Sequence, residues 1–257
     1  MKKILIYLMT AIVAMVMIFS ACERENYEEV DSENDTGGGG GGGENKQALV
    51  SSIFDMAGEE TISFTYDAQN RLSSVNWDDG DNIIFTYPSN NSIRVIMWGS
   101  EYMFTLNNDG YIVKCCAEGE CWNYEYENGY LKREVYDNGN YIVNYTWENG
   151  NLKSRQDNEG YYRTYSYGTT PYKEANIAPY SLPPASFLDE GDMYIHAILP
   201  KAYFGKRSKY LITSKNTNMP YDFNAKYRYQ TNSDGYVTKV YWELEGEEDL
   251  RFEIQYK

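Results

Sequence analysis

Histidine is nearly absent from this sequence, with 1 in 257 residues, and catalytic signatures are equally scarce. The single histidine, His196, lies in the apolar run MYIHAIL with no nucleophile motif around it. We therefore interpret it as a packed or surface residue and not as a general base. Carboxylates are plentiful, so a glycan-acting hydrolase with an acidic pair stays open as an alternative. The sequence predicts a protein that is not an enzyme and uses no cofactor.

Positive charge is also in short supply. Lys and Arg together number 23 against 38 Asp and Glu, which gives a formal net charge of −15. Proteins that bind nucleic acids draw most of their non-specific affinity from cations that neutralise phosphates. This composition therefore argues against DNA or RNA as a partner.

Cysteine occurs 4 times, and three of the four lie in the segment CCAEGEC. A turn at residues 118–119 would place Cys116 opposite Cys121, where a disulfide is feasible; free thiols are the other possibility. Zinc needs four ligands and His196 is far away in the sequence, so no zinc site is expected. The acidic residues 78–81 lack the spacing of a calcium loop and are interpreted as a solvated turn, so the sequence predicts no metal site.

Proline is rare outside one stretch, because six of the 7 prolines lie between residues 171 and 220. Proline does not suit a central strand, so we expect a proline-rich insertion in the fold near residues 168–220. The segment Ser186–Asp189 could begin a short helix, which would make the insertion partly helical.

The N-terminus carries the pattern of a lipoprotein signal peptide. Two lysines precede an apolar run from Ile4 to Phe19, which ends in the triplet Ser20-Ala21-Cys22. Small residues directly before a cysteine are typical of the cleavage site at which the cysteine thiol receives lipid. We predict a signal peptide over residues 1–21 and lipid attachment at Cys22, with a transmembrane anchor as the alternative.

Residues 22–47 have the composition of a disordered tether. Acidic residues dominate positions 23–35, and glycine fills positions 37–43. Such a segment cannot bury enough apolar surface to fold. An acidic stretch directly after a lipidated cysteine resembles the surface-export signal of Bacteroidota lipoproteins. The resemblance implies an outer-membrane lipoprotein whose domain is exposed at the cell surface, and a periplasm-facing protein is the alternative.

Turn-forming residues recur at intervals of about ten residues between Gly58 and Gly160, which is the spacing of strands joined by hairpins. Dipeptides such as Asn128-Gly129 and Asn149-Gly150 suit two-residue turns, in which φ is positive. Between the turns, apolar and polar residues alternate with period two, as strands require. The sequence predicts one all-β domain over residues 48–257, a large antiparallel meander that forms a curved sheet or a barrel-like fold.

Three runs, FTYDAQNRLSSV, YENGYLKREVYDNGNYIVNYTWENGNLKS and YQTNSDGYVTKVYW, resemble the tyrosine-and-turn pattern of YD repeats. With the N-terminal cysteine motif and the segment LPKAYFGKRSKYL, the chain resembles an uncharacterised family of Bacteroidota lipoproteins that has a porin-like β fold. The resemblance implies fold and location and supplies no activity. The expected strands are about seven residues long where a membrane-spanning strand needs roughly 9–11, so we do not expect the domain itself to span a membrane.

Two groups of side chains are candidates for binding. An exposed aromatic platform could stack on the sugar rings of a polysaccharide, although the same rings could instead fill the core; it comprises Trp98, Trp122 and Tyr124.

A basic run without intervening acids could contact anionic lipid, lipopolysaccharide phosphate or an acidic partner, or form a solvated loop; it comprises Lys201, Lys206, Arg207, Lys209 and Lys215. We predict a surface-anchored binding or interaction module with glycans or an envelope protein as candidate partners; the alternative is a structural scaffold.

Overall fold

The computed structural model describes residues 48–257 except for residues 98, 137–138, 174–202, 221 and 245. Residues 48–257 form one compact unit. Several predictions fall outside the described residues, namely those for the signal peptide, Cys22, the tether, Trp98, the helix start at residues 186–189, His196 and Lys201. No helix among the described residues has the length and hydropathy to cross a membrane.

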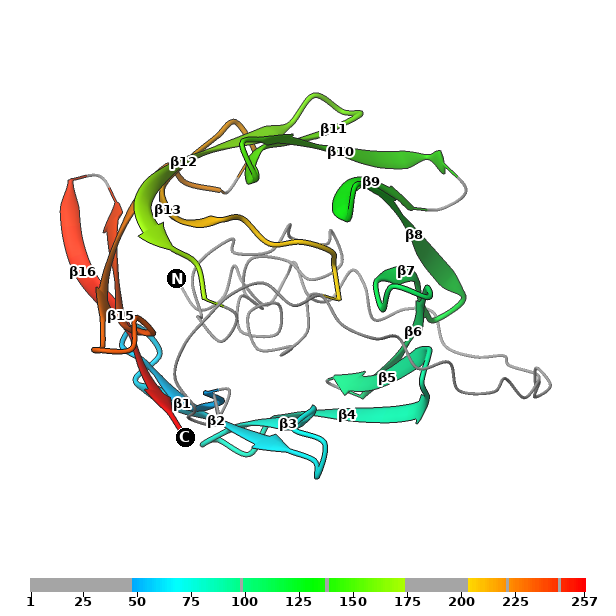
Figure 1. The fold of residues 1–257 in the computed structure, drawn as a ribbon, viewed down its shortest axis with the longest axis horizontal. Helices are drawn as coiled ribbons and strands as arrows, with labels where there is room; N and C mark the ends of the chain where they lie inside the picture. Colours follow the sequence, from blue (N-terminus) through cyan, green and yellow to red (C-terminus); the bar gives the residue numbers. More distant parts are fainter. Residues whose placement is uncertain (1–47, 98, 137–138, 174–202, 221, 245) are drawn as a thin grey trace, which may run out of the picture. The chain divides into compact units, whose positions relative to one another are not determined.

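The described chain folds as a closed barrel of antiparallel strands, each hydrogen-bonded to its neighbours in sequence, and β1 pairs with β16 to close the sheet (Figure 1). The strands are β1 Val50–Asp55, β2 Glu60–Tyr66, β3 Leu72–Trp77, β4 Asn82–Ser89, β5 Ser92–Met97, β6 Ser100–Leu106, β7 Ile112–Ala117, β8 Glu120–Glu127, β9 Tyr130–Tyr136, β10 Tyr141–Glu148, β11 Asn151–Asp157, β12 Tyr162–Pro171, β13 Tyr210–Thr217, β14 Ala225–Thr231, β15 Val237–Leu244 and β16 Glu247–Tyr256. The predicted all-β meander is confirmed.

Consecutive strands run in opposite directions, so their connections fall at two ends of the barrel. Both ends of the domain lie at one of them, where Leu49 and Lys257 exchange two backbone hydrogen bonds of 3.1 and 2.8 Å. We call this the terminal end; it includes the connections 67–71, 107–111, 128–129, 149–150, 203–209 and 232–236. We call the other the opposite end; it includes the connections 56–59, 78–81, 118–119, 158–161 and 218–224.

Two of the predicted two-residue turns have the expected backbone. At the terminal end, φ is +54° at Asn128 and +80° at Gly129, and the Asn149-Gly150 turn repeats these values within one degree. Positive φ at both positions gives the turn a twist that matches the flanking strands, and asparagine and glycine tolerate it at low cost. These residues therefore fix the register of the hairpins β8–β9 and β10–β11.

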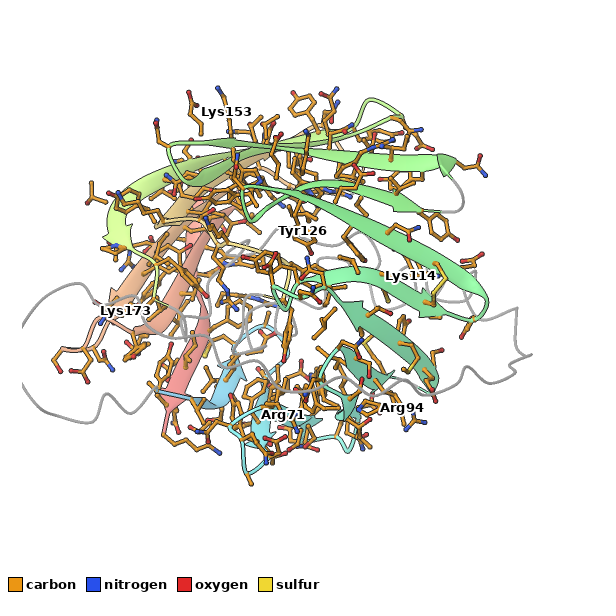
Figure 2. The ribbon with its side chains drawn as sticks, turned by 45° about the vertical axis from the view of Figure 1, so that its right-hand side comes forward. Arg71, Arg94, Lys114, Tyr126, Lys153 and Lys173 are labelled. Atoms are coloured by element: carbon orange, nitrogen blue, oxygen red, sulfur yellow. A yellow bond between two sulfur atoms is a disulfide. The ribbon has the colours of Figure 1, made fainter. Side chains whose placement is uncertain are left out.

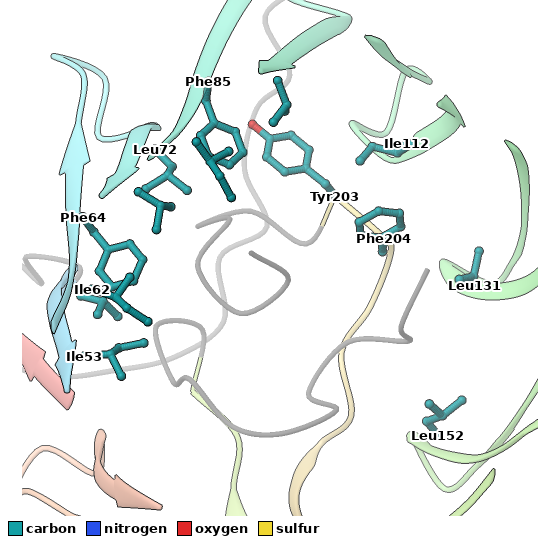
Figure 3. Close-up of a cluster of buried hydrophobic side chains, with 14 of the residues drawn as sticks. Ile53, Ile62, Phe64, Leu72, Phe85, Ile112, Leu131, Leu152, Tyr203 and Phe204 are labelled. Atoms are coloured by element: carbon teal, nitrogen blue, oxygen red, sulfur yellow. The ribbon is translucent and has the colours of Figure 1, made fainter. Parts of the chain in front are cut away.

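Apolar side chains line the inside of the barrel. Ile53, Ile62 and Leu72 are completely buried, and Figure 3 shows them on the inner face, with Leu131 and Leu152 on the far wall. The intervening residues of the same strands point outward and are polar or exposed. Alternation with period two thus places the apolar residues of each strand on one face of a sheet that curves around them.

The segment 203–209 lies against the barrel at the terminal end. Its backbone bonds to strand or turn residues at three places: Ile112 N donates to Tyr203 O (2.7 Å), Lys206 N to Gly129 O (2.7 Å) and Lys209 N to Gly150 O (3.0 Å). Tyr203 and Phe204 are buried among the inner-wall side chains (Figure 3). We call residues 203–209 the inner segment.

The insertion is shorter than the sequence predicts. Strand β12 continues through Pro171, and β13 occupies Tyr210–Thr217, so residues 168–171 and 210–217 of the predicted range 168–220 belong to the sheet. Pro171 is tolerated because it is the last residue of its strand, where a missing backbone donor does not interrupt the ladder. The register between β12 and β13 shifts twice in this region, which the sequence did not reveal.

Candidate functional site

The inner wall is not uniformly apolar, because charged side chains gather on one part of it. They come from neighbouring strands, and all are buried: Glu134 on β9, Arg155 and Asp157 on β11, Arg163 on β12 and Lys215 on β13. The strand register explains the gathering, since Arg155 stands directly opposite Tyr145 on one side and Arg163 on the other. We call this group the inner charge cluster.

The acids of the inner charge cluster have defined partners, and so does Asp222 of the β13–β14 connection, whose side chain is buried. Asp222 bridges two cations: Arg163 Nε donates to its Oδ2 at 2.8 Å, and Lys215 Nζ donates to its Oδ1. Tyr145 Oη donates to Glu134 Oε2 at 3.0 Å, and Tyr141 Oη donates to Asp157 Oδ2 at 3.0 Å. Burying charge is costly unless it is paired and hydrogen-bonded, and these contacts meet that condition.

Burial keeps the tyrosines of the inner wall protonated. Burial and the nearby Glu134 carboxylate raise the pKa of Tyr124 and of Tyr145 well above the ordinary value. Burial likewise raises the pKa of Tyr141 to about 12, with a smaller contribution from Asp157. At neutral pH these side chains are hydrogen-bond donors, so the cluster fits a structural or binding role better than proton abstraction.

The outer wall carries ion pairs between strands, and one of them, Arg228 on β14 with Glu248 on β16, reaches across β15. Arg94 and Glu101 are joined at 2.5 Å, Arg228 and Glu248 at 2.6 Å, and Lys132 and Glu127 at 3.1 Å. These side chains are well exposed, and Figure 2 shows Arg94 and Lys153 on the outside of the barrel and Tyr126 inside it. The outside of the barrel is therefore polar and charged along β5–β6, β8–β11 and β14–β16.

The two described members of the predicted aromatic platform, Trp122 and Tyr124, do not form an exposed surface. Tyr124 is only 4% exposed and packs edge-on against Phe204 of the inner segment, with ring centroids 5.5 Å apart. Trp122 is half-buried on the same face of β8 and stacks on Tyr136 at 4.9 Å. The prediction is wrong for Tyr124 because the period-two pattern could not tell which face of β8 turns inward.

The predicted basic run is divided between different environments. Lys206 and Lys209 are exposed at the terminal end, whereas Lys215 is buried in the inner charge cluster. Arg207 is half-buried and donates to Tyr172 Oη, and burial lowers its pKa to about 10. A single surface that contains all of these cations is therefore excluded, because Lys215 lies on the inward face of β13 whereas Lys206 and Lys209 lie in the inner segment before it.

Cys116 and Cys121 form a disulfide across the β7–β8 hairpin, whose turn at residues 118–119 has positive φ at both positions. Cys115 points to the inside as a free, buried thiol, and burial raises its pKa. Within the described ranges, no group of three or more His, Cys, Asp or Glu side chains could hold a metal ion.

Comparison with solved structures finds proteins of the same architecture. A porin-like protein from Bacteroides uniformis superimposes with a TM-score of 0.57 at 17% identity, and the match covers 82% of this chain and 97% of that chain. A porin-like protein from Bacteroides vulgatus gives a TM-score of 0.58 at 13% identity over 81% of this chain and 99% of that one. The chain shares their fold. No family model and no curated protein sequence matches the chain.

Proposed function

We propose that this chain is a lipid-anchored protein of the bacterial envelope whose barrel stands in water and acts by binding, without catalysis. The observation that carries the proposal is the polarity of the two faces of the sheet: ion pairs lie on the outer face and apolar side chains on the inner face. A barrel that spans a membrane needs the reverse on its outer face, namely an apolar band about 25 Å tall.

The outer ion pairs make a membrane-spanning arrangement costly. Arg or Lys on the lipid-facing side of a barrel costs about 2–4 kcal/mol near the bilayer midplane. The outer wall carries Arg94, Arg133 and Lys239 away from the ends of their strands, and each is paired with an acid on a neighbouring strand. Several such penalties would oppose insertion, while in water the same pairs are cheap to maintain.

Anchoring is supported by the sequence. The apolar run before Cys22 has the form of a lipoprotein signal. The porin-like neighbours from Bacteroides are consistent with an envelope protein. Because Tyr124 is buried, contact with a glycan or an envelope protein falls to the outer wall and the two ends. A scaffold recognised by shape alone is the second candidate.

Lipid labelling of the whole chain tests the proposal. The wild type and a Cys22→Ser variant, expressed with their own N-terminus in a Gram-negative host, are labelled with palmitate and partitioned between detergent and water. We expect the wild type to be labelled and to partition into detergent, and C22S to be unlabelled and folded, with its apolar run 4–19 uncleaved. Cys115→Ala is the matched control, because it removes a buried cysteine and should keep the label.

A spanning pore is the specific competitor, favoured by the porin-like architecture. A C22S protein that stays in the membrane through alkaline extraction and raises the conductance of a planar bilayer would overturn the proposal. A wild-type chain that receives no label would remove the anchor from it.

A further inference from the structure

Charge is segregated between the two ends of the barrel. The connections at the opposite end contain no Lys or Arg, and their acids include Glu59, Asp78, Asp79, Asp81, Glu118 and Glu159. The acids here repel one another electrostatically: burial and the carboxylates of Asp55, Asp79 and Asp78 raise the pKa of Glu60. The opposite end is therefore an acidic surface.

At the terminal end, cations outnumber acids among the described residues. The cations come from separate connections, because all connections from an even-numbered to an odd-numbered strand lie at this end; they are Arg71, Lys173, Lys206, Lys209 and Lys257. The acids of the same connections are Asp67, which pairs with Arg71, Asp109 and Asp234. Lys173 reaches the β14–β15 turn, where its ammonium donates to Asp234 O. The four lysines are exposed, and within the described part of the chain none of them is joined to an acid by an ion pair.

Tyrosine rings hold these cations in place. The charged groups lie over rings at 4.0 Å (Arg71 on Tyr87), 4.9 Å (Lys257 on Tyr66), 5.0 Å (Lys173 on Tyr236), 5.2 Å (Lys209 on Tyr210) and 5.3 Å (Lys206 on Tyr130). Backbone bonds to Gly129 and Gly150 fix the inner segment that carries two of them. The result is a preorganised set of cations with half-buried aromatic rings between them.

The chain enters the barrel at this same end. Val50 begins β1 beside Tyr256, and Leu49 pairs with Lys257, so the residues before Ala48 leave from the basic surface. Cys22 precedes Ala48 by 26 residues. Any membrane held by lipid on Cys22 is thus tethered to the terminal end and not to the acidic opposite end.

We propose that the terminal end docks on the phosphate-bearing headgroups of the membrane that holds the anchor. This inference rests on the proposed anchoring. Lysines near an anionic surface strengthen association by about fivefold each, and tyrosine rings favour the headgroup region. The acidic end is repelled by the same surface. The two effects orient the barrel upright, with the opposite end presented to partners.

Vesicle binding of the chain without its lipid and without the predicted signal peptide tests the docking surface by itself. Residues 22–257 with Cys22→Ser are sedimented with vesicles of equal parts phosphatidylglycerol and phosphatidylcholine, and with vesicles of phosphatidylcholine alone. We expect binding to the anionic vesicles only, and its loss on going from about 0.1 M to 1 M salt, where the screening length shrinks from roughly 10 Å to 3 Å.

Charge-removing variants locate the surface. Lys206→Gln with Lys209→Gln should lower the vesicle partition coefficient roughly 30-fold, since each lysine contributes about fivefold. The matched control is Lys226→Gln with Lys239→Gln, two lysines of the outer wall that are paired with acids, which should leave binding within about twofold. Thermal unfolding of every variant verifies that it is folded.

The outcomes separate the competing occupants. Equal losses in both pairs of variants, or no binding to anionic vesicles, would overturn the docking proposal. Binding that appears only after the acids at positions 23–35 are replaced by serine would also overturn it, because the acidic tether would then occupy the basic end. Failure of palmitate labelling, by contrast, contradicts the anchor and leaves the vesicle result intact.

Discussion

Near the terminal end, aromatic side chains at equivalent positions of successive hairpins donate hydrogen bonds to backbone carbonyls. On seven even-numbered strands the ring donates to the carbonyl oxygen of an apolar residue on the preceding strand, and these donors are Tyr66, Tyr87, Tyr126, Trp147, Tyr167, Tyr229 and Tyr256. The acceptors lie on buried residues such as Leu72, Ile112 and Leu152. The ladder register shifts beside three of the acceptors, Leu72, Leu131 and Leu152, and in each case a ring of the following strand donates to the carbonyl at this irregular point.

Removing one such hydroxyl should destabilise the barrel. Tyr126 Oη donates to Ile112 O at 2.6 Å, and Tyr126→Phe leaves this buried carbonyl without that donor. We expect a loss of about 1–2 kcal/mol in the free energy of unfolding by urea. Tyr162→Phe on the outer wall is the control and should change stability by less than about 0.5 kcal/mol. Equal effects would show that the hydroxyl contributes nothing specific.

Glu60 gives a pH-dependent prediction. Its pKa is raised in the folded protein by burial and by Asp55, Asp79 and Asp78, so the folded state holds the proton more tightly than the unfolded state. The stabilisation by that proton is complete below the unfolded pKa and is lost as pH rises through the folded pKa. Glu60→Gln should therefore raise the thermal midpoint by about 1–2 °C at pH 7, where the charge is removed.

The gain from Glu60→Gln should disappear below pH 4.5, the ordinary pKa of glutamate, because the wild type is then protonated as well. Glu159→Gln, a change at another exposed acid of the opposite end, serves as the comparison. A gain that persists unchanged at acidic pH would contradict the electrostatic explanation.

At the scale of elements, the inner segment depends on one glycine. Gly205 has φ +84°, and a Cβ there would lie 2.6 Å from Gly129 O and 3.0 Å from the Tyr126 ring. Gly205→Ala combines a left-handed backbone penalty of about 1–2 kcal/mol with overpacking of about 1–3 kcal/mol. We expect the free energy of unfolding to fall by the sum of the backbone penalty and the overpacking cost.

Gly110→Ala separates the two contributions. Gly110 has nearly the same φ, +81°, but nothing lies within 4 Å of a Cβ at this position. The free energy of unfolding of Gly110→Ala should therefore fall only by the backbone penalty of about 1–2 kcal/mol. If the two variants lose the same amount, the inner segment is not tightly packed against the β8–β9 turn.

At the scale of the whole molecule, Asp222 connects the β13–β14 connection to β12 and β13 through Arg163 and Lys215. Asp222→Ala would remove the carboxylate that two buried cations share, and breaking a buried pair in this way costs about 3–5 kcal/mol. Denaturant titration should show this loss. Glu243→Gln, which removes an outer-wall partner of Lys226, should cost less than about 1 kcal/mol. Similar losses would mean that the cluster is well hydrated.

The sequence by itself determined the strands and their turns. Alternation along β2 and the dipeptides Asn128-Gly129 and Asn149-Gly150 predict local geometry, because period and φ depend on neighbouring residues only. The spacing in CCAEGEC indicates a hairpin that can bring Cys116 opposite Cys121, as the structure has it. The excess of acids predicts, from composition alone, that DNA and RNA are not partners.

Only the tertiary structure decided which residues meet across distance. Closure of the sheet brings β1 next to β16. It also decides which face of each strand points inward, so that Tyr124 and Lys215 are buried, while Lys206 outside the strands is exposed. The inner charge cluster and the basic terminal end both join residues from separate hairpins. Strand order and the choice of inner face are set by burying the apolar wall of the whole sheet, and this is a property that no local window of sequence contains.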